Sequence, residues 1–100
     1  MKVKINSVHF KTDKSLDDFI ESKLNKLYTL HESIHNSDVT LRVDKDESHE
    51  NKVVEIRLDL PGGEIFAKKQ CKSFEEATDL TIDALKKQLI KHKEKVKNKI

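Results

Sequence analysis

Histidine and glutamate at residues 31–35 form the most specific chemical pattern in this sequence, because they spell His-Glu-Ser-Ile-His. On a helix, two histidines four residues apart can bind zinc from one face while the glutamate acts as a general base. The context for that chemistry is poor, since the match lies at the end of a predicted helix and no His-x-x-Gly-x-x-His extension follows it. We therefore interpret these histidines as residues near a helix C-terminus, where the helix dipole favours positive charge, and predict no metal site.

The single cysteine, Cys71, is the other candidate for chemistry. It precedes a predicted helix N-terminus, which can lower the pKa of a thiol, but its neighbour Lys72 is no positioned general base. We expect a half-buried structural cysteine in a reducing, cytoplasmic compartment. No other residues form a catalytic set, and no apolar stretch approaches membrane-spanning length. We predict a protein that is not an enzyme, uses no cofactor and no small-molecule substrate, and does not contact a membrane.

Lysine is the residue type whose placement is most informative. Residues 86–100 hold seven lysines against Glu94, a net charge of +6, which leaves −4 on residues 1–85 of a chain whose total is +2. Such an asymmetry favours a phosphate-rich partner at the basic end, while the acidic remainder disfavours indiscriminate binding to anions. A lysine-rich helix that is merely solvated is the alternative that composition leaves open.

A helix predicted over residues 73–95 must position most of these lysines. Ser73 can accept a backbone N–H of the first turn, and Glu76 can reach back to it as in a capping box. At 100° per residue one stripe of the helix consists of Phe74, Thr78, Thr81, Ile82, Leu85 and Leu89, with Ala77 and Ala84 on its edge. A ridge beside the stripe consists of Lys87, Lys91 and Lys95. Such a helix spans roughly 35 Å, so we expect its distal, lysine-bearing turns to project from a small domain.

The remaining elements follow from the periodicity of the apolar residues. Alternation with period two predicts strands over residues 1–6, 39–44, 53–60 and 64–71, with a tight Pro-Gly-Gly turn before the last. Helical spacing predicts a first helix over about 14–31. Three residues could cap it, namely Thr12, Asp13 and Ser15. The order β-α-β-β-β-α predicts an α+β fold in a single domain over residues 1–100.

Each predicted strand has one apolar and one charged face, so the two helices must cover one side of a four-stranded sheet. The last three strands should form an antiparallel meander, whereas the first two, joined through a helix, should be parallel. In this two-layer arrangement two parallel helices lie side by side, with Lys23 and Lys26 of the first near the lysine ridge of the second. The charged face of the sheet is mixed in sign and lacks an aromatic anchor for a protein partner.

With this order of elements, the chain resembles the short form of the ribosome hibernation-promoting factors, also called ribosome-associated inhibitor (protein Y) or sigma-54 modulation proteins. The resemblance covers essentially all 100 residues. Its most specific part is a closing-helix pattern, A-x-D-x(5)-L-x-x-Q-L-x-K-x-K, which begins at Ala77 and ends at Lys93. A second match is the K-L-x-K-L segment at residues 23–27.

The resemblance implies a fold like a double-stranded-RNA-binding domain with an added first strand. It implies a bacterial factor that binds ribosomal RNA of the small ribosomal subunit, in the channel for messenger and transfer RNA, and blocks translation by occupancy under stress or in stationary phase. Carried over residue by residue, the RNA contacts fall on Lys23, Lys26, Lys86, Lys87, Gln88, Lys91 and Lys93. We add Lys95 from the ridge and His92, which departs from the family's frequent tyrosine and could stack on a base or pack inward.

The sequence also bears on oligomeric state and on the C-terminal residues. Because the chain ends at residue 100, we expect no ribosome dimerisation through the carboxy-terminal domain of long family members, and a monomer off the ribosome. Residues 96–100 would be either a docking extension or a disordered basic tail. Two other readings of the same fold stay open: a ribosome-independent module for double-stranded RNA, and a protein-binding regulatory module.

Overall fold

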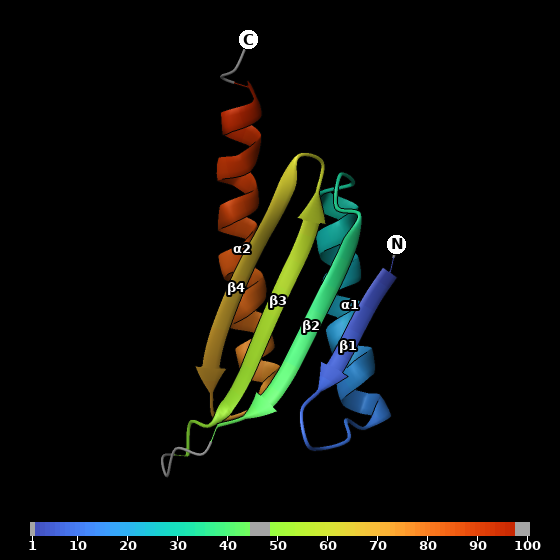
Figure 1. Ribbon diagram of the computed structural model, residues 1–100, viewed down its shortest axis with the longest axis vertical. Coiled ribbons are helices and arrows are strands. Elements are labelled where there is room, and N and C mark those ends of the chain that lie inside the picture. The colour runs from blue at the N-terminus through green and yellow to red at the C-terminus, as the bar shows by residue number, and fades with distance from the viewer. Residues whose placement is uncertain (1, 45–48, 98–100) are drawn as a thin grey trace.

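The chain folds into four strands and two helices in the predicted order (Figure 1). The computed structural model describes residues 2–44 and 49–97, with side chains up to residue 92. The elements are β1 (Lys2–Ser7), α1 (Lys14–Leu30), β2 (Asn36–Val43), β3 (Lys52–Leu60), β4 (Gly63–Cys71) and α2 (Phe74–Lys97). The predicted α+β fold class is thereby confirmed.

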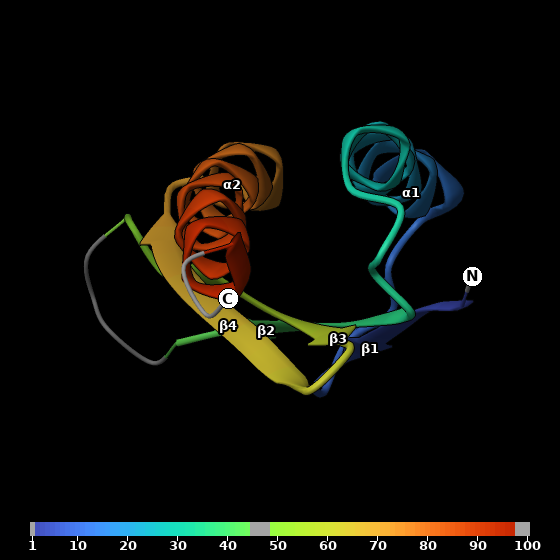
Figure 2. The same cartoon turned by 90° about the horizontal axis from the view of Figure 1, so that it is seen from above.

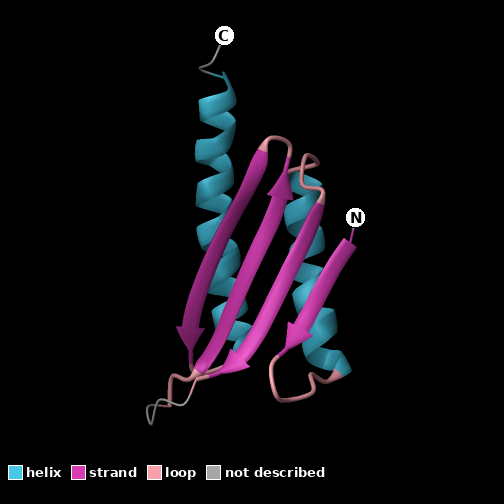
Figure 3. Cartoon of the chain, in the orientation of Figure 1, coloured by secondary structure: helices cyan, strands magenta, loops and turns pink. Residues whose placement is uncertain are grey.

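All four strands form one sheet in the order β1-β2-β3-β4 (Figure 3). β1 lies parallel to β2, with Ile5 opposite Val39, because the chain returns through α1 before it enters the second strand. The β2–β3 and β3–β4 pairs are antiparallel. The β3–β4 hairpin turns at Pro61 and Gly62, where Gly62 has a φ of 83° that glycine adopts at little cost. The predicted meander and parallel first pair are both confirmed.

Both helices cover the same face of the sheet and leave the other face open (Figure 2). They run parallel, since each begins at the end of the molecule where β1, β2 and β4 finish (Figure 1). The core between the layers takes Ile20, Leu24, Leu27 and Tyr28 from α1 and Ala77, Ile82, Leu85 and Leu89 from α2. Full burial of a leucine or isoleucine side chain contributes about 1.5–3 kcal/mol, so these predicted stripes fix how each helix is rotated on the sheet.

Polar side chains begin both helices. Asp13, one of the three candidates, is the N-cap of α1, and its carboxylate accepts the backbone N–H of Leu16 at 2.8 Å. The Ser73 hydroxyl accepts the backbone N–H of Glu76 at 3.1 Å at the start of α2. α2 continues to Lys97, and its last turns project past the sheet as predicted (Figure 1). Residues 98–100 lie outside the described residues, so the nature of the tail stays a prediction.

β2 begins three residues before the predicted strand, at Asn36. The reason is a buried polar contact: Ser37 is only 1% exposed, and its hydroxyl lies 2.5 Å from the hydroxyl of Tyr28 on α1. A serine in a core position is invisible to a hydrophobic pattern, although its hydrogen bond makes the position stable. Burial raises the pKa of Tyr28, and the hydrogen bond to Ser37 opposes that rise.

The open face of the sheet carries ion pairs across neighbouring strands. Arg57 of β3 contacts Asp38 of β2 and lies 3.5 Å from Glu64 of β4. Arg42 of β2 lies 3.1 Å from Glu55 of β3. These pairs are at least partly exposed, so each contributes little to stability, but together they keep strands of mixed charge in register.

Phe66 corrects one expectation about this face. Its neighbour Ala67 points into the core, so Phe66 points outward, and it is 50% exposed. The prediction that the open face lacks an aromatic residue is therefore wrong. Val53 lies on the same open face but, unlike Phe66, is only 1% exposed. It is paired with Arg42 of β2 on one side and with Gln70 of β4 on the other.

Candidate nucleic-acid interface

The second half of α2 presents three exposed lysines, Lys86, Lys87 and Lys91. None of the three forms an ion pair with a described acidic side chain. They lie toward the negative end of the helix dipole, which favours cations there. Only the last turns of α2 project past the sheet (Figure 1), and Lys86 and Lys87 lie beside the sheet, next to Gln88, which bonds to Phe66 of β4. All three lysines are exposed, so their charge is accessible to a large anionic partner.

Helical geometry divides these lysines between two sides of α2. Asp79 marks the side that faces α1, because its carboxylate lies 3.0 Å from the ammonium of Lys23. At 3.6 residues per turn, Lys86 lies within about 20° of Asp79 around the helix axis. Lys87 and Lys91 lie about 80° and 120° away. Lys87 and Lys91, two members of the predicted ridge, therefore lie close together on the exposed side of α2, whereas Lys86 lies on the side that faces α1.

Lys23 lies beside α2, as predicted, but next to its acidic first half. The ammonium pairs with Asp79 and lies 5.4 Å from the centre of the Phe19 ring, an ammonium–aromatic contact. Lys26 follows three residues later on α1 and is exposed. The two helices run side by side, but the structure does not place Lys23 against the lysine ridge. The role of both residues in RNA binding stays a prediction.

Gln88 and His92 lie on the flank of α2 near the sheet. The side-chain amide of Gln88 donates a hydrogen bond of 2.8 Å to the backbone carbonyl of Phe66 on the edge strand β4. This bond ties the helix to the sheet edge, so Gln88 has a structural role besides the predicted RNA contact. His92 is partly buried. The backbone of α2 includes Lys93 and Lys95, whose side chains lie outside the described residues.

Two exposed apolar residues accompany the lysines and were not among the predicted site residues. Leu30, at the end of α1, is 63% exposed, and Ile90 of α2 is 54% exposed. Leu30 is seven residues after Lys23 and Ile90 is eleven after Asp79, so each lies within about 20° of the side that faces the other helix. Their spacing from Lys23 and Asp79 would identify both residues once the contact between these two is known. The sequence does not predict that contact.

The His-Glu-Ser-Ile-His segment does not have the geometry of a zinc site. α1 ends at Leu30, and His31 is its C-cap. The backbone N–H of His35 already bonds to the carbonyl of Asp59 at 2.8 Å, at the start of β2. The two histidines of this segment therefore do not share one helical face, and the side chains described in residues 2–44 and 49–92 include no group of three metal ligands.

Cys71 is buried, and its pKa is raised rather than lowered. Burial is the main cause, and the carboxylates of Glu76 and Glu50 add to it, while Lys69 acts in the opposite direction. A raised pKa keeps the thiol protonated and unreactive, in agreement with a structural cysteine. None of the helices in the described part of the chain has both the length and the apolarity to cross a membrane.

Comparison with known proteins places this geometry in a family. The family model described as sigma 54 modulation protein / S30EA ribosomal protein matches residues 3–97. A ribosome hibernation promoting factor of Pseudomonas putida is 34% identical over 95 residues, which cover 95% of this chain and 89% of the relative. The ribosome hibernation promoting factor of Escherichia coli K12 is 32% identical over 97 residues, covering 97% of this chain and 98% of the relative.

Two solved structures share the fold. A ribosomal subunit interface protein from Coxiella burnetii superposes with a TM-score of 0.84 at 24% identity, over 93% of this chain and 98% of that chain. The N-terminal domain of Thermus thermophilus Protein Y superposes with a TM-score of 0.75 at 24% identity, over 88% of this chain and 94% of that chain. At this identity the likeness supports the four-stranded sheet with its two helices.

Proposed function

Because the chain belongs to the sigma 54 modulation protein / S30EA ribosomal protein family, we propose that it is a ribosome hibernation factor acting in the cytoplasm. Its target is the small ribosomal subunit, which it binds through ribosomal RNA in the channel for messenger and transfer RNA. Relatives named ribosome hibernation promoting factor, at 30–34% identity, support the hibernation role. The choice of subunit and channel rests on the resemblance of the closing helix to the family pattern.

One observation carries the RNA-binding part of the proposal. Lys86, Lys87 and Lys91 are exposed on the second half of α2, and no described carboxylate neutralises them. A lysine ammonium is a compact point charge without the planar fork of arginine. Such a surface suits phosphate groups and fixes position on RNA, but it reads no base sequence.

Occupancy alone accounts for inhibition. A domain with principal extents of 50 × 25 × 18 Å that sits on channel RNA excludes other ligands by its volume and needs no turnover and no cofactor. Leu30 and Ile90, exposed on the facing sides of the two helices, add apolar contact for ribose or base surfaces between the phosphates. The predicted contacts at Lys93 and Lys95 extend the same surface along α2.

The test replaces three lysines by glutamine, K86Q/K87Q/K91Q, and measures co-sedimentation with purified small subunits. Each lost lysine–phosphate contact reduces the steepness of log K against log salt by about 0.7–0.9, so the slope of the triple variant should be shallower by about 2 to 3 units. We expect at least about tenfold weaker binding at physiological salt. Glutamine avoids new like-charge pairs on the helix, so folding should be retained.

The matched control is K2Q/K14Q/K72Q, which removes the same charge from three exposed lysines away from this surface. Its affinity and salt slope should stay near those of the unmodified protein. Equal loss in both triple variants would mean that net charge alone drives binding. Unchanged binding of K86Q/K87Q/K91Q would contradict the assigned surface.

Phe66 favours a second candidate function, protein binding through the open face of the sheet. An exposed aromatic side chain beside Arg57 is the kind of residue that anchors protein interfaces. F66A separates the two candidates, because it should leave binding to purified small subunits unchanged if the lysine surface carries the function. Loss of binding in F66A, with K86Q/K87Q/K91Q unaffected, would favour the sheet face.

A further inference from the structure

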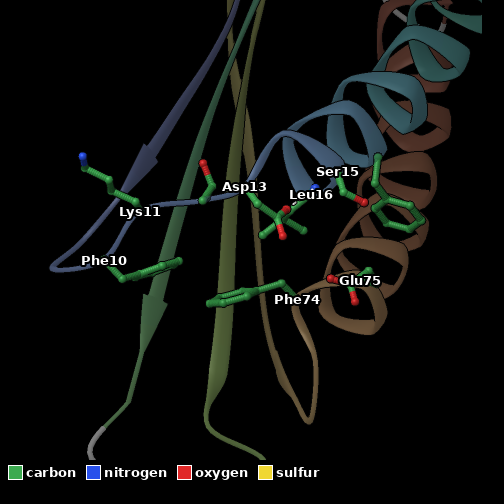
Figure 4. A pocket seen from close by; sticks show the side chains of 9 residues that line it. Phe10, Lys11, Asp13, Ser15, Leu16, Phe74 and Glu75 are labelled. Atoms are coloured by element: carbon green, nitrogen blue, oxygen red, sulfur yellow. Dashed lines mark hydrogen bonds between the residues drawn. The ribbon is translucent and has the colours of Figure 1, made fainter.

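A pocket lies at the opposite end of the molecule from the exposed lysines of α2, where both helices begin (Figure 4). Its volume is about 500 Å³, and it is bounded by the loop after β1, the first turns of α1 and the start of α2. Phe10 and Phe74 lie along one side of it, with Asp13 and Leu16 across from them (Figure 4). Neither the comparisons nor the proposed RNA surface assigns a role to this pocket.

Aromatic rings are concentrated at this pocket. Three of the four phenylalanines of the chain, Phe10, Phe19 and Phe74, line it, although none of them is fully buried. The rings of Phe10 and Phe74 are stacked, with centroids 5.2 Å apart and an interplanar angle of 12°. This nearly parallel pair presents a flat π surface to the pocket, and π faces attract cations.

The loop that carries Phe10 is held firmly in place. The hydroxyl of Ser7 donates to the backbone carbonyl of Phe10 at 2.5 Å. The backbone N–H of Val8 bonds to the carbonyl of Leu41 at 2.9 Å. His9 between them has a φ of 64°, a left-handed conformation that non-glycine residues seldom adopt. The ring of Phe10 is thus presented by a fixed backbone, which lowers the ordering cost of binding.

Two carboxylates complete the pocket. One carboxylate oxygen of Asp13 caps α1 by accepting the backbone N–H of Leu16, and the second oxygen has no described partner. Glu75 lines the pocket without an ion pair to any described residue. Lys11, the one lysine in the lining, extends away from the pocket (Figure 4). The two full negative charges exceed the partial positive charges of the two helix N-termini, about half a charge each, so the pocket favours a cation.

The protein already contains one cation bound in this way. The ammonium of Lys23 lies over the Phe19 ring at 5.4 Å and pairs with the carboxylate of Asp79 at 3.0 Å. The pocket offers the same combination, an aromatic face and a carboxylate within reach, one helical turn nearer the N-termini. Lys23 is thus a cation at the Phe19 wall of the pocket, but its ammonium is already paired with Asp79, and no ion pair joins a described lysine or arginine to Asp13 or Glu75.

We propose that this pocket binds an arginine side chain of a basic protein partner. A guanidinium is planar and weakly hydrated, so it stacks on aromatic rings while donating to carboxylates at its edge, which an ammonium does less well. Anionic ligands would be repelled by Asp13 and Glu75, and a purely apolar ligand would strip water from both carboxylates without replacing their hydrogen bonds. The site lies far from Lys86 and Lys91 along α2, so the inference does not depend on RNA binding.

The test titrates the full chain with the peptide acetyl-Gly-Arg-Gly-amide and follows backbone amide signals by NMR. We expect saturable shifts confined to the pocket-lining segments 10–19 and 74–75. The control peptide replaces arginine by citrulline, which keeps the shape and removes the charge, and it should cause no saturable shifts. E75Q and F10L should each weaken arginine-peptide binding about threefold to fivefold, as expected for loss of one exposed ion pair or one cation–π contact.

Several results would overturn the proposal. Equal shifts with the citrulline peptide would mean that the pocket recognises the shape of the side chain and not its charge. Shifts spread over all acidic surfaces, or unaffected by E75Q, would mean diffuse attraction. Saturable shifts with adenosine and none with the arginine peptide would assign the stacked rings to a nucleobase instead. Because Phe10 is partly buried and F10L also changes packing, E75Q, at an exposed position, decides the case if the two variants differ.

Discussion

The hydroxyl pair between Tyr28 and Ser37 is the most specific polar contact in the core, because it joins α1 to β2 inside an apolar layer. Removal of one hydroxyl leaves the other buried without its partner, which costs about 1–3 kcal/mol. Y28F and S37A should therefore each lower the free energy of unfolding in urea by about that amount. The double variant should lose less than the sum of the single losses, since the contact is broken only once. Additive losses would show that the two hydroxyls do not depend on each other.

Stability should fall in alkaline solution because two buried acids hold their protons. Burial raises the pKa of Cys71 and of Tyr28 above their ordinary values of about 9 and 10. Above about pH 9 the unfolded chain therefore releases protons that the folded chain retains, and the free energy of unfolding declines as pH rises. This stability is fully present below the unfolded-state pKa values and is lost as pH rises toward the folded ones.

Urea unfolding at pH 8 and at about pH 10.5 checks this dependence. The unmodified protein should be less stable at the higher pH. C71A should lose less stability over this interval than the unmodified protein, whatever its stability at pH 8. An equal or steeper decline in C71A would contradict the role of the thiol.

At the scale of elements, the contact between α1 and α2 controls how much positive charge the first helix presents. Lys23 is neutralised by Asp79, although the pair is half exposed and contributes little to stability. D79N should release the ammonium of Lys23 and raise affinity for small subunits about twofold to fivefold at low salt, in keeping with an exposed ion pair of about 0.2–1 kcal/mol.

E76Q is the matched control for this prediction, since it removes one acidic charge from the same helix without releasing Lys23. Both variants should fold as the unmodified protein does. A gain in D79N that E76Q does not share would place Lys23 at the RNA. Equal gains would attribute the effect to net charge, and a loss in D79N would mean that the ion pair positions the helices for binding.

The elements themselves were predictable because each has one dominant period. Leu24 and Leu85 stand on clear 3.6-residue stripes, and the strands alternate with period two, so type and order follow from the pattern. Prediction from the pattern failed at residues whose burial does not match the polarity of their side chains. Ser37 is polar but buried, and Phe66 is aromatic but exposed.

The specific side-chain contacts between elements could not be predicted from the sequence. The pairing of Lys23 with Asp79 depends on how far α1 is shifted along α2, which the core packing sets and no local pattern reveals. The bond from Gln88 to the carbonyl of Phe66 likewise depends on where α2 crosses the edge strand. The distribution of the lysines around α2 follows from their spacing, but which of them faces α1 depends on the Lys23–Asp79 contact and was not predictable.

At the scale of the whole molecule, charge and aromatic surface separate along α2. Its first half carries Glu75, Glu76 and Asp79 near the phenylalanine pocket, and its second half carries the exposed lysines. A molecule with such opposite ends is oriented in an electrostatic field, with the projecting basic end toward RNA and the acidic end away from it. The same separation allows the pocket and the RNA surface to be occupied together.

A cryo-electron microscopy reconstruction of purified small subunits with the protein would show directly where it binds. We expect one bound copy in the channel for messenger and transfer RNA, with the second half of α2 against ribosomal RNA and Lys86, Lys87 and Lys91 facing phosphates. Density for the protein outside the channel, or contact with the subunit through the open face around Phe66, would contradict it.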